Sequence, residues 1–169
     1  MKVLFSETEI AEKINEIGSD ITATYKDEPL TVMLIVNGAF VFGADLIRKL
    51  DLECWVDSIA AASYSNDRST GKVHLRSEPK LPVEGRHILL VDEVLDSGRT
   101  MLRLKQYFMD AGAKSVKSAV LVEKEIPRPD GDPHADWVCF YCPDKYLVGC
   151  GLDSNELYRN LPFVGVMEE

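Results

Sequence analysis

The sequence predicts an α/β protein whose mostly parallel central sheet is flanked by helices. Continuous runs of aliphatic and β-branched residues, such as residues 30–36 and 88–91, are typical of strands buried on both faces of a parallel sheet. Segments with helical periodicity follow such runs, and turn residues separate the two kinds of segment. Strands that alternate with helices in this way form right-handed crossovers within one sheet.

Length, composition and charge limit the classes of protein that need to be considered. With 169 residues, 46% of them hydrophobic, the chain is long enough for one domain with a core and short for two. Its 28 acidic and 19 basic side chains give a net charge of −9, which repels nucleic acids and anionic membrane surfaces. The apolar runs are far shorter than the roughly 18 residues that span a bilayer. We expect a single cytoplasmic domain with no nucleic-acid or membrane partner.

The N-terminal half begins with a helix that has a clear start signal. Ser6 followed by Glu9 matches a capping box, and isoleucines then recur at helical spacing, which predicts a helix over residues 7–25. Pro29 separates this helix from the first buried run. The further elements expected in this half are a strand over 30–36, a helix over 40–50 and a strand over 55–64.

A long loop separates the two halves of the predicted core. Residues 65–85 are rich in turn formers and contain two prolines, and structureless loops of about twenty residues in compact domains are usually lids or binding loops. The C-terminal third resembles a small appendage on the core. The elements expected after the loop are a strand over 88–91, a helix over 99–111 stopped by Gly112, strands over 115–122 and 137–142, and short pieces around 145–148 and 163–166.

One stretch, RHILLVDEVLDSGRTMLR, carries most of the chemistry. A buried strand ends in Asp92 and Glu93, and a turn then opens a helix. The N-terminus of a helix exposes unpaired N–H groups and the positive end of the helix dipole, and Ser97, Arg99 and Thr100 add further donors. The loop is therefore suited to hold a phosphate. The two carboxylates need sugar hydroxyls or a divalent cation as partners, unless they are only a solvated strand end.

The cysteines and histidines give weaker signals. Cys139 and Cys142 form a C-x-x-C pair, but no second pair completes a zinc site. We interpret the cysteines as ordinary buried thiols, with zinc binding or redox chemistry as the alternative. His74, His87 and His134 lie near none of the motifs and are interpreted as structural or surface residues.

The run ILLVDEVLDSGRT is similar to the signature with which type I phosphoribosyltransferases bind phosphoribosyl pyrophosphate (PRPP). Ser63 and Tyr64 at the start of the long loop, the segment LVEK ending in Lys124, and the run CPDKYLVGCGLDSNELYRNLPFVGV resemble hypoxanthine-guanine phosphoribosyltransferases. The resemblance covers almost the whole chain. It implies a type I phosphoribosyltransferase fold with a core over about 28–124, a small hood from 125–169 plus the N-terminal segment, and a long flexible loop.

The resemblance also implies a reaction. Ribose 5-phosphate passes from PRPP to N9 of hypoxanthine or guanine in purine salvage, and pyrophosphate leaves with the help of Mg²⁺. A carboxylate that takes or shares the N7 proton makes the base a better nucleophile, and Asp96 matches this general base. The implied PRPP contacts are Asp96, Ser97, Gly98, Arg99 and Thr100 for the 5′-phosphate, Asp92 and Glu93 for the ribose hydroxyls, Asn37, Gly38 and Arg159 for the pyrophosphate, and Asp153 near the magnesium ion, with Asp92 and Glu93 as further metal ligands.

The remaining matches concern the purine. Lys124 matches a donor to the 6-oxygen, and an ammonium group, which only donates, clashes with the 6-amino group of adenine. Tyr146 matches the aromatic residue that stacks on the base, and Leu147 matches a backbone contact. Ser63 and Tyr64 belong to the lid that would exclude water.

Two positions depart from the family pattern, and some alternatives remain. Asn37 stands where the family usually has a lysine, after a peptide that is often cis, and the order Asp92-Glu93 reverses the commoner Glu-Asp. Without the resemblance, Tyr146 would be interpreted as core packing and Arg159 as a surface ion pair.

The resemblance also leaves three functional questions open. The alternative functions are a xanthine-preferring enzyme, a PRPP-fold regulator that binds nucleotide and RNA, and a nucleotide-binding module without catalysis. The acidic charge and the absence of a basic stripe argue against the regulator. Family resemblance further suggests a homodimer or homotetramer.

Overall fold

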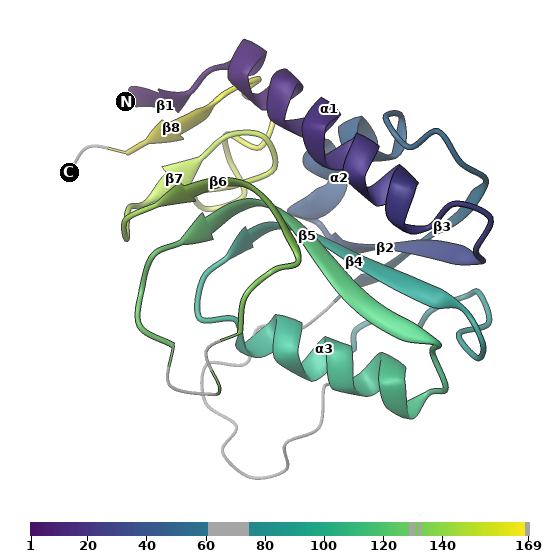
Figure 1. The fold of residues 1–169 in the computed structure, drawn as a ribbon. Helices are drawn as coiled ribbons and strands as arrows, with labels where there is room; N and C mark the ends of the chain where they lie inside the picture. Colours follow the sequence, from purple (N-terminus) through teal and green to yellow (C-terminus); the bar gives the residue numbers. More distant parts are fainter. Residues whose placement is uncertain (61–74, 129–130, 132, 168–169) are drawn as a thin grey trace, which may run out of the picture.

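The computed structural model describes residues 1–60, 75–128, 131 and 133–167, and it has the predicted α/β architecture. A five-stranded sheet with the order β3-β2-β4-β5-β6 is parallel throughout, and helices cover both of its faces (Figure 1). A second, three-stranded antiparallel sheet has the order β1-β8-β7. The predicted fold class is therefore confirmed.

The elements follow one another along the chain as strand and helix pairs. Among the described residues they are β1 (Lys2–Phe5), α1 (Glu7–Thr24), β2 (Leu30–Val36), α2 (Ala39–Ile47), β3 (Cys54–Ala60), β4 (His87–Leu95), α3 (Arg99–Asp110), β5 (Ser115–Lys124), β6 (Trp137–Cys142), β7 (Leu147–Val148) and β8 (Val164–Val166). None of the helices in this part of the chain is long and apolar enough to cross a membrane.

The central sheet buries a layer of side chains on each face. Successive residues of a strand point to opposite faces, so Val32 and Leu34 of β2 pack with α1 and α2, while Met33 and Ile35 pack on the α3 side. Every residue from Leu30 to Ile35 is buried, which explains the continuous apolar run. The capping box at the start of α1 is present as predicted, since Ser6 and Glu9 each accept a hydrogen bond from the other's backbone.

Several predicted boundaries were wrong. The strand expected over 88–91 continues to Leu95, because its ladder with β5 extends through Val94 and Leu95. Asp92 and Glu93 therefore lie inside β4 rather than after it. The helix expected over 40–50 ends at Ile47.

The N-terminal strand was not predicted at all. β1 pairs with β8 near the other end of the chain, so the two terminal segments lie side by side (Figure 1). Phe5 stacks on Phe140 with ring centroids 4.0 Å apart, which joins the small sheet to β6. β6 falls in the segment assigned to the hood but forms the edge of the central sheet. The division into core and hood stays a prediction.

Part of the long loop lies outside the described residues. Residues 61–74 as a whole lie outside the described ranges, which also removes the proposed lid residues Ser63 and Tyr64, the end of the strand expected over 55–64, and His74. The described end of the loop is anchored by Asp57 of β3, whose Oδ2 accepts hydrogen bonds from the backbone N–H groups of Lys80 and Leu81 at 2.7 and 2.9 Å.

Candidate active site

A cavity of about 500 Å³ lies at the carboxyl ends of β2 and β4, the edge at which α/β sheets usually bind ligands. The hood contributes its other side. Among the residues expected to contact PRPP or metal, those that line it are Asn37, Gly38, Asp92, Glu93, Asp96, Ser97, Gly98, Thr100, Asp153 and Arg159.

The phosphate loop, which we define as residues 96–100, leads directly into α3. Gly98 has φ of +74°, a left-handed conformation that favours glycine, and a Cβ atom there would lie 2.4 Å from Cγ of Pro133. Ser97 Oγ accepts a hydrogen bond from the Arg99 N–H at 3.4 Å. The N-cap residue of α3 is Gly98, which has no side chain to accept from the N–H groups of the first turn. The positive end of this helix therefore faces the cavity edge, where it is suited to bind an anion.

Asp92 and Glu93 present two adjacent carboxylates to the same cavity. Burial raises the pKa of Asp92 well above its ordinary value, and the neighbouring charge of Glu93 adds to this effect. Glu93 Oε2 is buried without a hydrogen-bond partner among the described residues. A buried carboxylate oxygen without a donor is costly, so the site has unused capacity to accept ligand hydroxyls or a cation.

Two glycines allow the loop after β2 and the hood to approach these carboxylates. A Cβ atom on Gly38 would lie 2.0 Å from the carboxylate of Glu93, and one on Gly151 would lie 2.0 Å from the Gly38 carbonyl oxygen. The peptide between Val36 and Asn37, a position where the family often has a cis peptide, is cis. Gly38 in the loop after β2, Glu93 in β4 and Gly151 in the hood are therefore packed against one another at the cavity wall.

Lys124 ends β5 and reaches toward the phosphate loop. Its Nζ lies 3.3 Å from Asp96 Oδ2 and 2.9 Å from Asp144 Oδ1, and its side chain is 13% exposed. Burial opposes the charge on this ammonium group, but hydrogen bonding and attraction from Asp144 and Asp96 outweigh it and raise the pKa of Lys124. The structure therefore joins the residue expected to contact the purine to the expected general base.

Arg159 and Asp153 form the hood side of the cavity. Arg159 Nη1 donates to the Gly151 carbonyl at 2.6 Å, and its Nη2 lies 3.0 Å from Asp153 Oδ1 and 2.9 Å from Glu156 Oε2. Asp153 Oδ2 also accepts a hydrogen bond from the Glu156 N–H at 2.8 Å. Arg159 makes ion pairs, as the alternative interpretation expected, yet it also lines the cavity.

Four of the predicted site residues that the structure describes are not part of this lining, namely Lys124, Tyr146, Leu147 and Arg99. Tyr146 is 56% exposed, so the alternative that it packs in the core is wrong. Leu147 is buried in β7, and Arg99 opens α3 beside the cavity. An exposed ring that precedes a buried strand is available to stack on a base.

The structure adds residues that sequence analysis missed. Arg76 and Glu156 line the cavity, and Asp144 pairs with Lys124, although the P-D-K element had already pointed to that segment. Arg128 was treated as part of a proline-rich connection, but its guanidinium is buried and donates to the carbonyl of Asp96 in the phosphate loop. The sequence offers no local signal for this contact.

The remaining sequence interpretations fare differently. His134 is a surface residue as expected, with a side chain that is 58% exposed, although its Nδ1 contacts Glu123 Oε1 in the LVEK segment. His87 pairs with Ser115 and Glu28 at the other end of the sheet, as a structural residue would. The four cysteines are free, and Cys139 and Cys142 are buried. Within the described ranges, no group of three or more His, Cys, Asp or Glu side chains is arranged to hold a metal ion.

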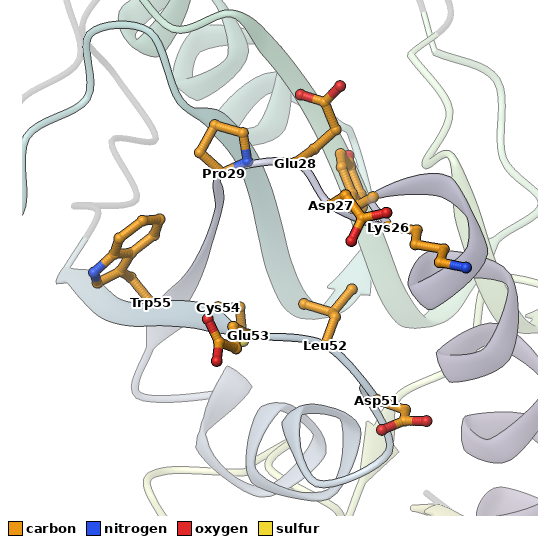
Figure 2. A pocket seen from close by; sticks show the side chains of 10 residues that line it. Lys26, Asp27, Glu28, Pro29, Asp51, Leu52, Glu53, Cys54 and Trp55 are labelled. Atoms are coloured by element: carbon orange, nitrogen blue, oxygen red, sulfur yellow. The ribbon is translucent and has the colours of Figure 1, made fainter.

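A second cavity, of about 690 Å³, lies away from all of these motifs (Figure 2). The turn before β2 and the segment entering β3 form its walls, so it opens at the amino ends of these strands. Four of the residues that line it are acidic, namely Asp27, Glu28, Asp51 and Glu53, and one, Lys26, is basic. Because this edge carries neither the phosphate loop nor the carboxylates of β4, the first cavity is the candidate active site.

Comparisons with known proteins agree with the motifs. Residues 3–155 match the model of the phosphoribosyl transferase domain family. The hypoxanthine-guanine phosphoribosyltransferase of Bacillus subtilis is 40% identical, with 99% of this chain and 93% of that protein covered. The hypoxanthine-guanine-xanthine phosphoribosyltransferase of Tritrichomonas foetus is 32% identical, with 99% and 92% covered. A solved structure of a hypoxanthine-guanine phosphoribosyltransferase from Bacillus anthracis superposes with a TM-score of 0.93 at 36% identity and covers 99% of each chain.

Proposed function

Because the chain belongs to the phosphoribosyltransferase family, and within it to the hypoxanthine-guanine phosphoribosyltransferases, we propose that the cavity between β4 and the hood is its active site. The enzyme transfers 5-phosphoribose from PRPP to N9 of a 6-oxopurine, hypoxanthine or guanine, and releases pyrophosphate. This is a purine salvage reaction. The names of the relatives favour it over a nucleotide-binding regulator and over a module without catalysis.

The observation that carries the proposal is the pair formed by Lys124 and Asp96, whose Nζ and Oδ2 atoms lie 3.3 Å apart. The 6-oxygen and N7 are neighbours on one edge of a 6-oxopurine. An ammonium group beside a carboxylate matches that edge, because the lysine donates to O6 while the carboxylate accepts the proton of N7. Adenine would present its 6-amino donor to the ammonium and be rejected.

The PRPP half of the site follows from the phosphate loop. The N–H groups at the start of α3, with the hydroxyls of Ser97 and Thr100, would hold the 5′-phosphate. Asp92 and Glu93 would accept hydrogen bonds from the ribose hydroxyls. As the bond to pyrophosphate breaks, positive charge develops on the ribose, and Asp96 takes the N7 proton while N9 attacks. Asn37, Gly38 and Arg159 would contact the pyrophosphate, and Arg99 would contribute at the phosphate loop.

Tyr146 and Leu147 complete the purine half of the proposal. The exposed ring of Tyr146 would stack on the base, and the backbone of Leu147 would contact it. Their place in the hood, next to Asp144, supports this role, because Asp144 already pairs with Lys124. Both contacts would orient the base with its O6 and N7 edge toward the strand ends.

Mg²⁺ fits the donors that the cavity offers. Carboxylate oxygens are its preferred protein ligands, and Mg²⁺ typically takes only one or two of them together with substrate oxygens and water. Asp153 would hold the ion together with one carboxylate of the pair Asp92 and Glu93, and the orphan Oε2 of Glu93 supports this choice. When bound, the ion would neutralise charge on the pyrophosphate.

We further propose that the chain is a single domain that works in the cytoplasm as a homodimer or homotetramer. Trp55 and Val56 support self-association, because they lie on the edge strand β3 and are 44% and 45% exposed. Light scattering after size exclusion tests this directly. A dimer or tetramer is expected, and a monomer at the concentrations used for assays would contradict it.

The enzymatic proposal is tested by supplying PRPP and Mg²⁺ with hypoxanthine, guanine, xanthine or adenine in separate reactions and following nucleotide and pyrophosphate. We expect equal amounts of both products with hypoxanthine or guanine and none with adenine. Fastest turnover with xanthine would instead indicate the xanthine-preferring alternative. The enzyme proposal fails if no base gives a nucleotide.

A further inference from the structure

Arg128 is a buried arginine that none of the proposed substrate contacts uses. It lies in the connection between β5 and β6, and its side chain is 2% exposed. Nη1 pairs with Oε1 of Glu123 at 3.2 Å, and the Glu123 side chain is also 2% exposed. A charge this far from water needs compensation, which Glu123 supplies.

The other nitrogens of Arg128 hold backbone carbonyls from two strand ends. Nε donates to the Asp96 carbonyl at 2.8 Å, and Nη2 donates to the Leu95 carbonyl at 3.4 Å. Nη2 also donates to the Lys124 carbonyl. One rigid guanidinium thus ties the end of β4 to the end of β5, at the two residues that carry the general base and the purine lysine.

The partner of Arg128 is itself fixed from several sides. Glu123 Oε2 accepts the N–H of Ala135 at 3.1 Å, and its Oε1 contacts Nδ1 of His134. The connection between β5 and β6 also contacts the phosphate loop, because Pro133 occupies the space that a side chain on Gly98 would need. The connection between β5 and β6 therefore braces the loop that holds the expected phosphate.

Stability alone does not explain this arrangement. A buried ion pair costs desolvation, and well-packed apolar residues often replace one without loss of stability. A guanidinium, unlike an apolar chain or an ammonium group, offers five donors in a fixed planar fork. Such a fork is suited to hold three carbonyls in a defined geometry.

We propose that Arg128 is a positioning residue that holds Asp96 and Lys124 at the separation required by the N7 and O6 edge of the purine. The proposal rests on the proposed function of that pair. Catalytic groups must be held within a fraction of an ångström, since small misplacements lower rates strongly. Arg128 acts only through Asp96 and Lys124 and need not touch a substrate.

The test compares Arg128→Lys with Arg86→Lys. Arg86 is the control, because it is a partly buried arginine whose guanidinium stacks on the ring of Trp55 at 4.0 Å. It precedes β4, at the amino end of the strand and away from the candidate active site. For each variant the folded fraction, kcat, and the KM values for hypoxanthine and for PRPP are measured. In Arg128→Lys, we expect kcat per folded enzyme to fall about tenfold or more and the KM for hypoxanthine to rise, while the KM for PRPP stays within about threefold. Arg86→Lys should change each value less than about twofold.

Several outcomes would overturn the inference. The inference is wrong if the kinetics of Arg128→Lys are unchanged, or if kcat falls only in proportion to the folded fraction. It is also wrong if the KM values for hypoxanthine and PRPP rise equally. If Arg128→Lys does not fold, Glu123→Gln keeps the volume and an acceptor while weakening the grip on Arg128, and it must show the same split between the two KM values. A wild-type protein that forms no nucleotide contradicts the proposed function instead, which separates the two failures.

Discussion

Lys124 Nζ lies 3.3 Å from Asp96 Oδ2 and 2.9 Å from Asp144 Oδ1, so one ammonium group is shared by two carboxylates. The two carboxylates outweigh burial and raise the pKa of Lys124, which keeps it charged at neutral pH. Asp144 can hold the lysine while Asp96 turns to a ligand. This arrangement gives the site a fixed donor and a carboxylate acceptor side by side.

Removing the ammonium group should weaken the choice among bases. In Lys124→Ala the 6-oxygen loses its donor and adenine loses its clash, so we expect kcat/KM for hypoxanthine to fall about tenfold to a hundredfold while any activity with adenine does not fall. Steady-state kinetics with both bases measure this. Lys145→Ala is the control, because Lys145 is an exposed lysine in the connection between β6 and β7, next in sequence to the Asp144 that pairs with Lys124. Retained preference for 6-oxopurines in Lys124→Ala would refute the role of Lys124.

The raised pKa of Asp92 should make stability depend on pH. The folded protein holds the proton of Asp92 more tightly than the unfolded chain does, so this group's contribution to stability is present at acid pH and is lost as pH rises from the ordinary value of 3.8 through the raised one. In the wild type, Asp92 Oδ1 accepts a hydrogen bond from the Glu93 N–H at 3.0 Å. In Asp92→Asn the side chain cannot ionise but keeps an oxygen that can accept this bond.

Thermal unfolding of Asp92→Asn over a range of pH tests this expectation. The variant should have a higher Tm than the wild type at pH 8, and the difference should shrink toward pH 4. Asp51→Asn, at an exposed carboxyl, is the control and should show no such trend. A lower Tm for Asp92→Asn at pH 8 would contradict the account.

The buried cysteines should be unreactive in the folded protein. Burial raises the pKa of Cys139 to about 12 and that of Cys150 to about 11, so at pH 8 only on the order of one Cys139 in ten thousand is a thiolate. Ellman's reagent should label half-buried Cys54 first and all four cysteines in guanidinium. Fast labelling of Cys139 or Cys142 in the native state would instead support the redox or metal-binding alternative.

Local patterns explain why much of the fold and the candidate site could be predicted. The capping box at Ser6, the apolar run of β2 and the turn before α3 each depend on residues close in sequence, so their signals survive without knowledge of the fold. Parallel strands then bring their carboxyl ends together. For this reason Asn37 and Asp92, which are far apart in the chain, line one cavity.

Non-local contacts explain the failures. β1 forms because Lys2 meets Val166, a partner at the far end of the chain that no short pattern reveals. β4 continues past its apolar run because ladder hydrogen bonds to β5 depend on backbone and not on side-chain polarity. Arg128 donates to backbone carbonyls. Because every residue has one, the sequence does not show which carbonyls lie near its guanidinium.

The central claim is that Asp96 acts as the base that takes the N7 proton. It is tested most directly by single-turnover kinetics and PRPP binding measured on the same preparation of Asp96→Asn. Asn keeps the size of the side chain and the backbone carbonyl that Arg128 holds, but it cannot accept a proton. If Asp96 is this base, the single-turnover rate of Asp96→Asn with hypoxanthine falls about a hundredfold or more while the Kd for PRPP changes less than about threefold. Equal losses in rate and in PRPP binding would contradict it and would leave Asp96 a role in positioning alone.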